Sequence, residues 1–508
     1  MAHEPMLADL AARTARARAM GGPRKLAERR AQGVLNARER LDLLFDAGSF
    51  LETGLFAQGV RPEVRDRTPA DGKVAGFGRI EGREVAAVSN DFTVMGAASS
   101  VVNGKKVGFV KRIATENGLP IVFLGESTGA RMPDNMGAAD IGGKSNPTQY
   151  LRMRESPWVS AVLGPCYGSS SWYAAMSDFV VMRKGAVMAV SSPKLTSVAT
   201  NEVTDPEELG GWRLHTQHTG LADLAVDTDE QAIAAVRRFL SYLPSHLNEP
   251  PPPAEPAEDP GAMDALGAIL PASRTQTYDV RRVLACIADP GSVFELKPRF
   301  GRAIVTALAR IGGRAVGIIA NNPIIKGGAI DVDACDKATS ALVLCDSFNL
   351  PIIFMVDQPG FLIGLEGERR RAPGRIMNWM NALTLCSVPK FSVIMRKSYG
   401  QAFLNMGGQG NAPEAVAWTT AEVGFMDPHY GARIVHGVTP AEPERYAEAV
   451  AAMTRDTSAW DIAAAYGVQA VIDPRETRDY LRGMLEVHSR APEGGVGQHL
   501  MRAWPTSI

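Results

Sequence analysis

Cysteine is scarce in this chain of 508 residues. The 5 cysteines are widely spread and mostly set in apolar runs, at Cys166, Cys286, Cys335, Cys345 and Cys386. An odd number of dispersed cysteines is typical of reduced, buried thiols and argues against a disulfide framework. No C-x-x-C pair occurs, which argues against a structural zinc ribbon, and we expect no metal site.

Long apolar runs and an excess of one charge are missing as well. No stretch approaches the ~20 apolar residues of a membrane helix, and the N-terminus lacks the apolar core of a secretory signal. The 54 basic and 55 acidic side chains give a formal net charge of -1, so no long-range field would gather a polyanion. We therefore expect a soluble, cytoplasmic protein that binds neither membranes nor nucleic acid.

The most informative feature that is present is an internal repeat. Residues 78–85 match residues 309–316 with Arg79 on Arg310, an offset of 231 (310 − 79 = 231). The same offset aligns further pairs, namely Asn90 with Asn321, Gly96 with Gly327, Lys106 with Lys337 and Gly129 with Gly360. Because a chance match does not keep one register over that length, the chain is predicted to be a duplicated domain.

A segment rich in proline and acidic residues separates the two copies. It includes Pro250–Pro253 as an unbroken run, followed by Glu255, Glu258 and Asp259. Such a composition buries little apolar area and favours an extended linker. We predict an N-terminal domain over residues 1–243, a linker over 244–262 and a C-terminal domain over 263–508.

Short apolar runs alternate with helical patterns in each copy. The expected strands and helix of the first copy cover residues 86–88, 121–124, 159–163 and 102–117, and those of the second cover 316–320, 352–356, 391–395 and 333–348. A strand, helix, strand order with short glycine-containing connections predicts parallel pairing and right-handed crossovers. The expected fold class is α/β, with two layered domains per chain.

Glycine-containing turns follow equivalent strands in the two copies. The turns after the second strand are residues 125–131 and 357–361, and those after the third are 164–170 and 396–402. Glycine where a strand meets a helix lets backbone amides face an incoming atom, and the positive end of the helix adds to the attraction. The turns predict one anion-stabilising site per copy; the alternative is that these glycines serve only close packing of helix on strand.

Taken together, these segments resemble the carboxyltransferase (beta) subunit of biotin-dependent acyl-CoA carboxylases, the propionyl-CoA carboxylase beta type. The similarity spans roughly residues 38–437 and rests on segments in fixed order, residues 89–96, 127–131, 164–168, 207–211, 356–361 and 396–400. It implies two crotonase-like domains per chain and a homo-hexamer built as a trimer of dimers. Each active site would lie between the N-terminal half of one subunit and the C-terminal half of its partner.

The resemblance also implies roles for particular residues. An acyl-CoA would bind the N-terminal domain, where the amides of Gly168 and Ser169 would hold the thioester enolate oxygen. The amides of Gln401 and Ala402 would hold the ureido oxygen of biotin, which a biotin carboxylase or biotin carrier subunit would deliver. No lysine stands in an Ala-Met-Lys-Met context, so the biotin would be attached to another chain. The further substrate-binding residues would be Gly129, Ala130, Tyr167, Gly360, Phe361, Tyr399, Gly400 and Leu404.

The chain departs from the family pattern at two of these positions. The family usually has Gly-Gly where this chain has Gly168-Ser169 and Gly400-Gln401. If the second residue of either pair required a positive φ, a side chain there would be strained.

Two other enzyme classes remain open at this point. A biotin-independent decarboxylase of a malonyl-type CoA thioester would need only the first anion site. A serine hydrolase would use Ser127, because residues 125–129 have the G-x-S-x-G spacing directly after an expected strand.

Three groups of polar residues allow a functional and a structural interpretation. His215 and His218, three residues apart, could share a helix face and bind a metal, or could be polar surface residues without a third ligand. The runs Arg369–Arg371 and Lys105–Lys106 could contact the phosphates of CoA or could be solvated.

Overall fold

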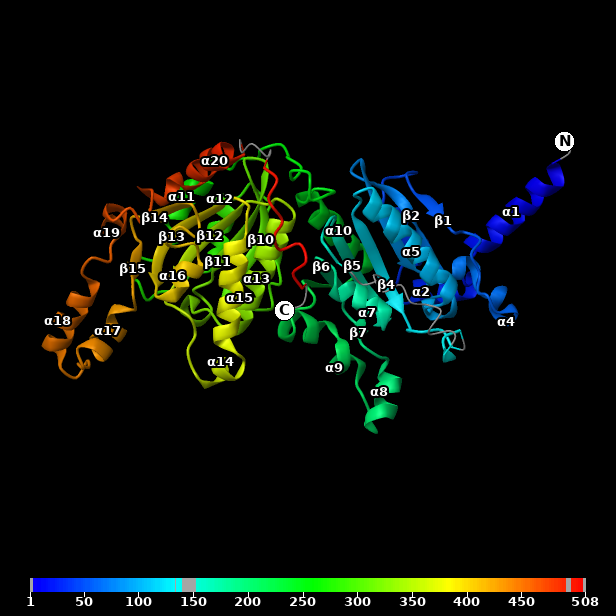
Figure 1. Cartoon of the computed structure of the whole chain (residues 1–508), viewed down its shortest axis with the longest axis horizontal. Helices are drawn as coiled ribbons and strands as arrows, with labels where there is room; N and C mark the ends of the chain where they lie inside the picture. The colour runs from blue at the N-terminus through cyan, green and yellow to red at the C-terminus, as the bar shows by residue number, and fades with distance from the viewer. Residues whose placement is uncertain (1–2, 133, 139–151, 490–494, 506–508) are drawn as a thin grey trace. The chain divides into compact units, whose positions relative to one another are not determined.

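The chain folds as two compact units, which divide between His246 and Leu247. The computed structural model describes residues 3–132, 134–138, 152–489 and 495–505 (Figure 1). Each unit has its own eight-stranded sheet with helices packed on it. The duplicated α/β domain predicted from the sequence is thereby confirmed.

The first unit is built on strands β1 to β8. Their bounds are β1 (Leu51–Thr53), β2 (Lys73–Ile80), β3 (Arg83–Asn90), β4 (Ile121–Ser127), β5 (Trp158–Tyr167), β6 (Phe179–Arg183), β7 (Val187–Ala189) and β8 (Leu224–Val226). The sheet order is β1-β2-β3-β4-β5-β6-β8, with β7 beside β5. The β1–β2 and β2–β3 pairs are antiparallel, and the remaining pairs are parallel.

The described helices of this unit precede, alternate with or follow its strands along the chain. They are α1 (Glu4–Arg18), α2 (Pro23–Ala31), α3 (Ala37–Leu44), α4 (Pro62–Arg65), η1 (Pro69–Gly72), η2 (Met95–Ala97), α5 (Val101–Glu116), α7 (Ser169–Ala175), α8 (Pro193–Thr200), α9 (Pro206–Gly210), η3 (Leu214–His218) and α10 (Asp229–Tyr242). A capping box formed by Ser100 and Asn103 starts α5, which then lies across β2 and β3 (Figure 1).

The second unit repeats the sheet with a new set of strands. Their bounds are β9 (Phe294–Leu296), β10 (Ile304–Ile311), β11 (Arg314–Asn321), β12 (Ile352–Gln358), β13 (Lys390–Tyr399), β14 (Glu414–Trp418), β15 (Glu422–Gly424) and β16 (Ala470–Ile472). The order β9-β10-β11-β12-β13-β14-β16, with β15 beside β13, matches the first sheet strand for strand. Even the register shift recurs, between Gly125 and Ser127 in the first unit and between Val356 and Gln358 in the second.

The helices of the second unit cover both faces of its sheet. They are α11 (Ala262–Gly267), α12 (Val280–Ile287), η4 (Lys326–Gly328), α13 (Val332–Ser347), α14 (Leu365–Arg369), α15 (Ala372–Leu385), α16 (Gln401–Asn405), α17 (Pro428–Val435), α18 (Pro443–Thr454), α19 (Ala459–Ala464), η5 (Pro474–Glu476) and α20 (Thr477–His488). Helix α13 packs against α15 (Figure 1). Because both faces are covered, strands such as β12 are buried throughout, and β12 is apolar over residues 352–356.

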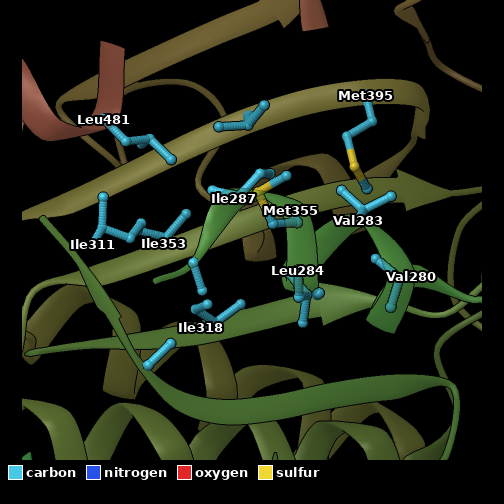
Figure 2. Close-up of a cluster of buried hydrophobic side chains, with 14 of the residues drawn as sticks. Val280, Val283, Leu284, Ile287, Ile311, Ile318, Ile353, Met355, Met395 and Leu481 are labelled. Carbon is cyan, nitrogen blue, oxygen red and sulfur yellow. The ribbon is translucent and has the colours of Figure 1, made fainter. Parts of the chain in front are cut away.

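The core of the second unit shows how one helix is fixed on the sheet (Figure 2). The buried residues of α12 recur at helical spacing, at Val280, Val283, Leu284 and Ile287. This apolar stripe packs against strand residues such as Ile318, Ile353 and Met355 and against Leu481 of α20. The stripe therefore decides which face of α12 meets the sheet.

Part of the proline-rich segment packs on the second unit. The Arg310 guanidinium donates to the Pro252 carbonyl at 2.9 Å, and the Ala254 amide donates to the Gly313 carbonyl at 3.0 Å. The Arg478 side chain donates to the Ala257 carbonyl at 2.7 Å. Residues 252–257 thus run along this unit, tied to it by their backbone.

Among the described helices, none combines the length and the apolar composition required to cross a bilayer.

Leu284→Ala should destabilise the protein by about 2–5 kcal/mol, because it removes a buried side chain and leaves a cavity beneath α12. Denaturant unfolding followed by circular dichroism measures the loss. Arg282→Ala, at an exposed position of the same helix, is the matched control and should have little effect. Equal losses for the two variants would contradict the packing described for α12.

Candidate functional site

The first predicted site lies where β4 and β5 end side by side. These strands are parallel, and their last paired residues are Ser127 and Cys166. Ala130 and Ser169 each stand three residues beyond that pair. The two turns predicted to carry chemistry therefore leave the sheet at the same edge, as expected for the carboxyl ends of parallel strands.

The hydrogen bonds of the first turn leave one amide without a protein acceptor. Ser99 forms an isolated parallel bridge with Ala130, in which the Ser99 amide donates to the Gly129 carbonyl at 2.7 Å and the Arg131 amide donates to the Ser99 carbonyl at 2.8 Å. On the Ala130 side, the bridge uses the carbonyl of the preceding residue and the amide of the following residue, but not the amide of Ala130 itself. Within the described part of the chain, the Ala130 amide has no acceptor.

The second turn supplies further amides. Gly168 has φ 61° and ψ −126° and precedes α7, and its own amide donates to the Val190 carbonyl at 3.3 Å. Ser169 and Ser170, the first two residues of α7, have amides without an acceptor among the residues that the structure describes. The amide of Ser169 is therefore available to a ligand, whereas the amide of Gly168 is already engaged.

Both turns border one cavity of about 1110 Å³. Ala130, Gly168 and Ser169 line it, and the Ser169 hydroxyl lies 3.1 Å from the Ser99 hydroxyl. The remaining lining includes an aromatic wall made by Phe109, Phe123, Trp158, Trp172 and Tyr173. The cavity thus combines backbone donors with an apolar surface, which suits a substrate with one polar reacting group.

The second unit repeats this arrangement of amides. Ile330 bridges Phe361, with the Ile330 amide donating to the Gly360 carbonyl at 3.1 Å and the Leu362 amide donating to the Ile330 carbonyl at 2.8 Å. In the described residues of this unit, the Phe361 amide has no acceptor. Because Gln358 pairs with Ser398, Phe361 and Gln401 again stand three residues beyond the last strand pair.

The glycine of the second turn behaves as its counterpart does. Gly400 has φ 62° and ψ −151°, and its amide donates to the Gly424 carbonyl at 3.0 Å. The amides of Gln401 and Ala402, at the start of α16, have no acceptor in the described ranges. Leu404 is half-buried on the same helix.

The departures from Gly-Gly cause no backbone strain. The positive φ falls on Gly168 and Gly400, and neither Ser169 nor Gln401 has a positive φ. Since only the first residue of each pair needs the left-handed region, a side chain is accommodated at the second.

The tyrosines before these glycines differ in their surroundings. The Tyr399 hydroxyl donates to Glu422 at 2.7 Å and accepts from Arg274 at 2.6 Å, and burial raises the pKa of Tyr399. Burial also raises the pKa of Tyr167. Both tyrosines are buried beside their turns, and their predicted contact with substrate stays a prediction.

A buried carboxylate stands at the end of each central strand. Glu126 accepts two hydrogen bonds from Arg29, at 2.5 and 2.7 Å, and one from Arg40 at 2.9 Å. Its counterpart Asp357 accepts from the Arg396 side chain at 2.8 Å. These ion pairs fix the residues directly before the two turns.

Sequence reasoning missed these ion pairs. Arg29 and Glu126 are 97 residues apart, and nothing in the local pattern joins them. The offset of 231 does align Glu126 with Asp357, so a shared acidic residue at this position was the available signal.

The serine hydrolase alternative is wrong. The Ser127 side chain is fully buried, its hydroxyl donates to the Ala97 carbonyl at 3.0 Å, and it accepts from the Gly129 amide at 3.2 Å. No histidine contacts this hydroxyl in the described part of the chain. Ser127 therefore holds the turn and cannot act as an exposed nucleophile.

Lys106 is not a contact for CoA phosphates. Its ammonium is buried and donates to the carbonyls of Gly54, Ala70 and Lys73 at 3.0, 3.3 and 2.5 Å. Its neighbour Lys105 is exposed and lines the cavity, so the two lysines have different roles.

The other polar groups are also resolved by their contacts. His215 is buried, with its ring nitrogens 2.7 Å from the Met188 carbonyl and 3.1 Å from the Thr219 hydroxyl, whereas His218 is exposed. No group of three or more metal-ligating side chains occurs among the described residues. Arg370, in the arginine run, forms an ion pair with Asp333.

Comparison with known proteins agrees with this geometry. Residues 28–497 match the model of the carboxyl transferase domain. The chain belongs to the carboxyl transferase domain family. This carboxyltransferase is 34% identical over 480 residues to the propionyl-CoA carboxylase beta chain of Roseobacter denitrificans, covering 93% of this chain and 94% of that protein.

Two further relatives cover almost the whole carboxyltransferase. The methylmalonyl-CoA decarboxylase subunit alpha of Veillonella parvula is 33% identical over 490 residues, with 94% of this chain and 96% of that protein covered. The crystal structure of transcarboxylase 12S, a hexamer with methylmalonyl-coenzyme A bound, has a TM-score of 0.88 at 33% identity and covers 96% of both chains. The crotonase-like fold implied by the sequence is thereby confirmed.

Glu126→Gln should lower the stability of the carboxyltransferase by about 3–5 kcal/mol, because Arg29 and Arg40 would lose a buried charged partner. Denaturant unfolding measures the change. Glu116→Gln, in an exposed ion pair with Arg112, is the control and should have little effect. A neutral result for Glu126→Gln would mean that the pair does not hold the turn.

Proposed function

We propose that the chain transfers a carboxyl group from carboxybiotin, carried on another protein, to the α-carbon of an acyl-CoA. The observation that supports this most is the pair of matching amide sites, one in each unit, at the same position of a duplicated fold. Relatives named propionyl-CoA carboxylase beta chain and transcarboxylase 12S cover more than nine-tenths of the chain.

The first amide site suits the thioester of the acyl-CoA. The Ala130 and Ser169 amides, with Ser170 beside them, would donate to the thioester oxygen, whose negative charge grows as the α-proton leaves. The aromatic wall of the cavity would bind the acyl chain and exclude water. Gly168 would contribute its conformation, since its own amide is bonded to Val190.

The second amide site suits biotin. The Phe361, Gln401 and Ala402 amides are donors, and the ureido oxygen of biotin is an acceptor. Carboxybiotin supplies the carboxyl group and, once that group has left, a basic nitrogen for the α-proton. The three amides would hold the ureido oxygen and orient the ring, while Leu404 on α16 would add an apolar contact.

The proposed quaternary structure is based on the same comparison. We propose a homo-hexamer in which the acyl-CoA site of one subunit meets the biotin site of a partner subunit. The transcarboxylase 12S relative is itself a hexamer. A biotin carboxylase or biotin carrier protein would be the second partner, because the carboxyl group must arrive on biotin.

Decarboxylation of a malonyl-type thioester is less well supported. The relative named for that activity is one subunit, so its name assigns decarboxylation to an assembly. A biotin-independent decarboxylase would need only the amides of the first unit. The matching amides of the second unit favour a reaction with two developing anions.

Ser169→Pro should slow carboxyl transfer to propionyl-CoA by ~10²–10³, because proline removes one N–H donor while remaining tolerated at the first position of a helix. The rate is measured as the transfer of labelled carboxyl groups from carboxybiotin to the acyl-CoA. Ser169→Ala keeps the amide and should stay close to wild type. Gln401→Pro and Gln401→Ala form the corresponding pair in the second unit, and equal rates within either pair would contradict the amide assignment.

Ser127→Ala should reduce carboxyl transfer by about 10- to 100-fold at most, because it removes two neutral hydrogen bonds that hold the turn. Loss of a true nucleophile costs on the order of 10⁶ in turnover. The same labelled-carboxyl assay distinguishes a residue that holds the turn from a nucleophile. A loss approaching the larger figure would restore Ser127 as a catalytic residue.

A further inference from the structure

Lys73 is a buried cation at the edge of the acyl-CoA cavity. It opens β2 and pairs with Asn90 at the end of β3. Its side chain is 5% exposed, lines the cavity, and donates to the Asn90 side-chain carbonyl at 2.9 Å and to the Ala97 carbonyl at 3.0 Å. A lysine in this setting costs desolvation energy that two neutral acceptors only partly offset.

The second unit shows that the fold does not need this cation. The offset of 231 aligns Lys73 with Ile304 (304 − 73 = 231), and Ile304 pairs with Asn321 as Lys73 pairs with Asn90. Ile304 is fully buried. An isoleucine therefore fits the same position of the same sheet.

A second buried lysine provides the contrast. Lys106 donates to three backbone carbonyls, one of them that of Lys73, and its counterpart Lys337 donates to three carbonyls, one of them that of Ile304. Because both copies keep this lysine with matching acceptors, its role is structural. Lys73 occurs only in the unit that contains the acyl-CoA cavity.

Hydrogen bonds connect Lys73 to the first turn. The Ala97 carbonyl accepts from Lys73 and also from the Ser127 hydroxyl, at 3.0 Å each. The Ser127 hydroxyl in turn accepts from the Gly129 amide at 3.2 Å. The ammonium is thus linked through two acceptors to the turn that presents the Ala130 amide.

We propose that Lys73 is a positioning and electrostatic residue of carboxyl transfer, whose positive charge beneath the cavity stabilises the enolate form of the acyl-CoA. The inference rests on the proposed function. The α-carbon loses its proton to the base supplied with biotin, and the electron pair of that bond moves onto the thioester oxygen. Lys73 forms no bond in this step; its charge acts on the oxygen through a poorly solvated interior.

The charge of Lys73 depends on pH in the neutral range. The charged or titratable groups around it are Asp71 of η1, Cys166 of β5, Arg131 after β4 and Lys106 of α5. Desolvation by burial outweighs these groups and lowers the pKa of Lys73 from its ordinary 10.5 to about 7. The ammonium is present below that pH and is lost above it, so enolate stabilisation should weaken as the pH rises.

The test uses the full chain, methylmalonyl-CoA as carboxyl donor and free biotin as acceptor, with kcat measured from about pH 5.5 to 9. Lys73→Ile should lower kcat on the order of 10- to 100-fold at pH 6 and abolish the fall through neutral pH. Lys73→Arg, which stays charged, should retain turnover, and its kcat should not fall as the pH rises through neutrality. A Lys73→Ile enzyme with the wild-type rate and pH profile would overturn the proposal.

Stability distinguishes this role from a structural one. Below about pH 7 the folded wild type holds a desolvated ammonium, so Lys73→Ile should not lower the unfolding temperature there. Any gain in the stability of Lys73→Ile over the wild type should shrink as the pH rises toward 10.5, because the lysine of the unfolded wild type also loses its proton there. If both Lys73→Ile and Lys73→Met are unfolded under conditions in which the wild type is folded, Lys73 is a structural lysine and the proposal is wrong.

Lys106→Met is the matched control, because burial also lowers the pKa of Lys106, to about 8. Lys106→Met should be less stable than the wild type, and its kcat should still fall as the pH rises through neutrality. If instead Lys106→Met removes this fall and Lys73→Ile does not, the assignment to Lys73 is wrong. If the wild type transfers no carboxyl group from any thioester, the proposed function fails, and that outcome is distinct from a failure of the Lys73 variants alone.

Discussion

Both candidate sites depend on a buried carboxylate. In each unit it stands where the pairing of the two central strands shifts its register. Glu126 falls at the register shift between Gly125 and Ser127, and Asp357 falls at the shift between Val356 and Gln358. A strand that loses its register there would leave the following turn without a fixed direction. Arginine side chains hold both carboxylates, so the amides beyond them emerge at one defined edge of each sheet.

The two units satisfy this constraint with different partners. Glu126 is held by Arg29 of α2 and Arg40 of α3, and Arg40 also pairs with Asp229, which ties the helices before the sheet to the one after it. Asp357 is held by Arg396 from the neighbouring strand. Duplication has therefore preserved the position of the acid but not the source of the base. The position matters because it precedes the turn, whereas any nearby cation can neutralise a buried carboxylate.

The sequence was sufficient for those parts of the molecule that depend on local pattern or on self-similarity. The repeat, the order of strands and helices and the glycines at 129, 168, 360 and 400 were predictable because each is fixed by its neighbours in the chain. Which amide is free was not, because the Gly168 amide bonds to Val190, and only the folded β7 region brings that carbonyl close. Burial of Ser127 and Lys106 was likewise decided by acceptors distant in sequence.

An internal duplication also separates structural residues from chemical ones without any second sequence. A residue kept in both units with the same partners, such as Lys106 and Lys337, serves what the units share, which is the fold. A buried charged residue found in one unit only, such as Lys73, is not required by the shared fold, because Ile304 occupies the equivalent position in the second unit. Tyr399 differs from its counterpart Tyr167 only in its surroundings, because its hydrogen bonds with Arg274 and Glu422 belong to the second unit. The two units therefore share the turn amides that have no acceptor among the described residues, and they differ in the side chains that surround those turns.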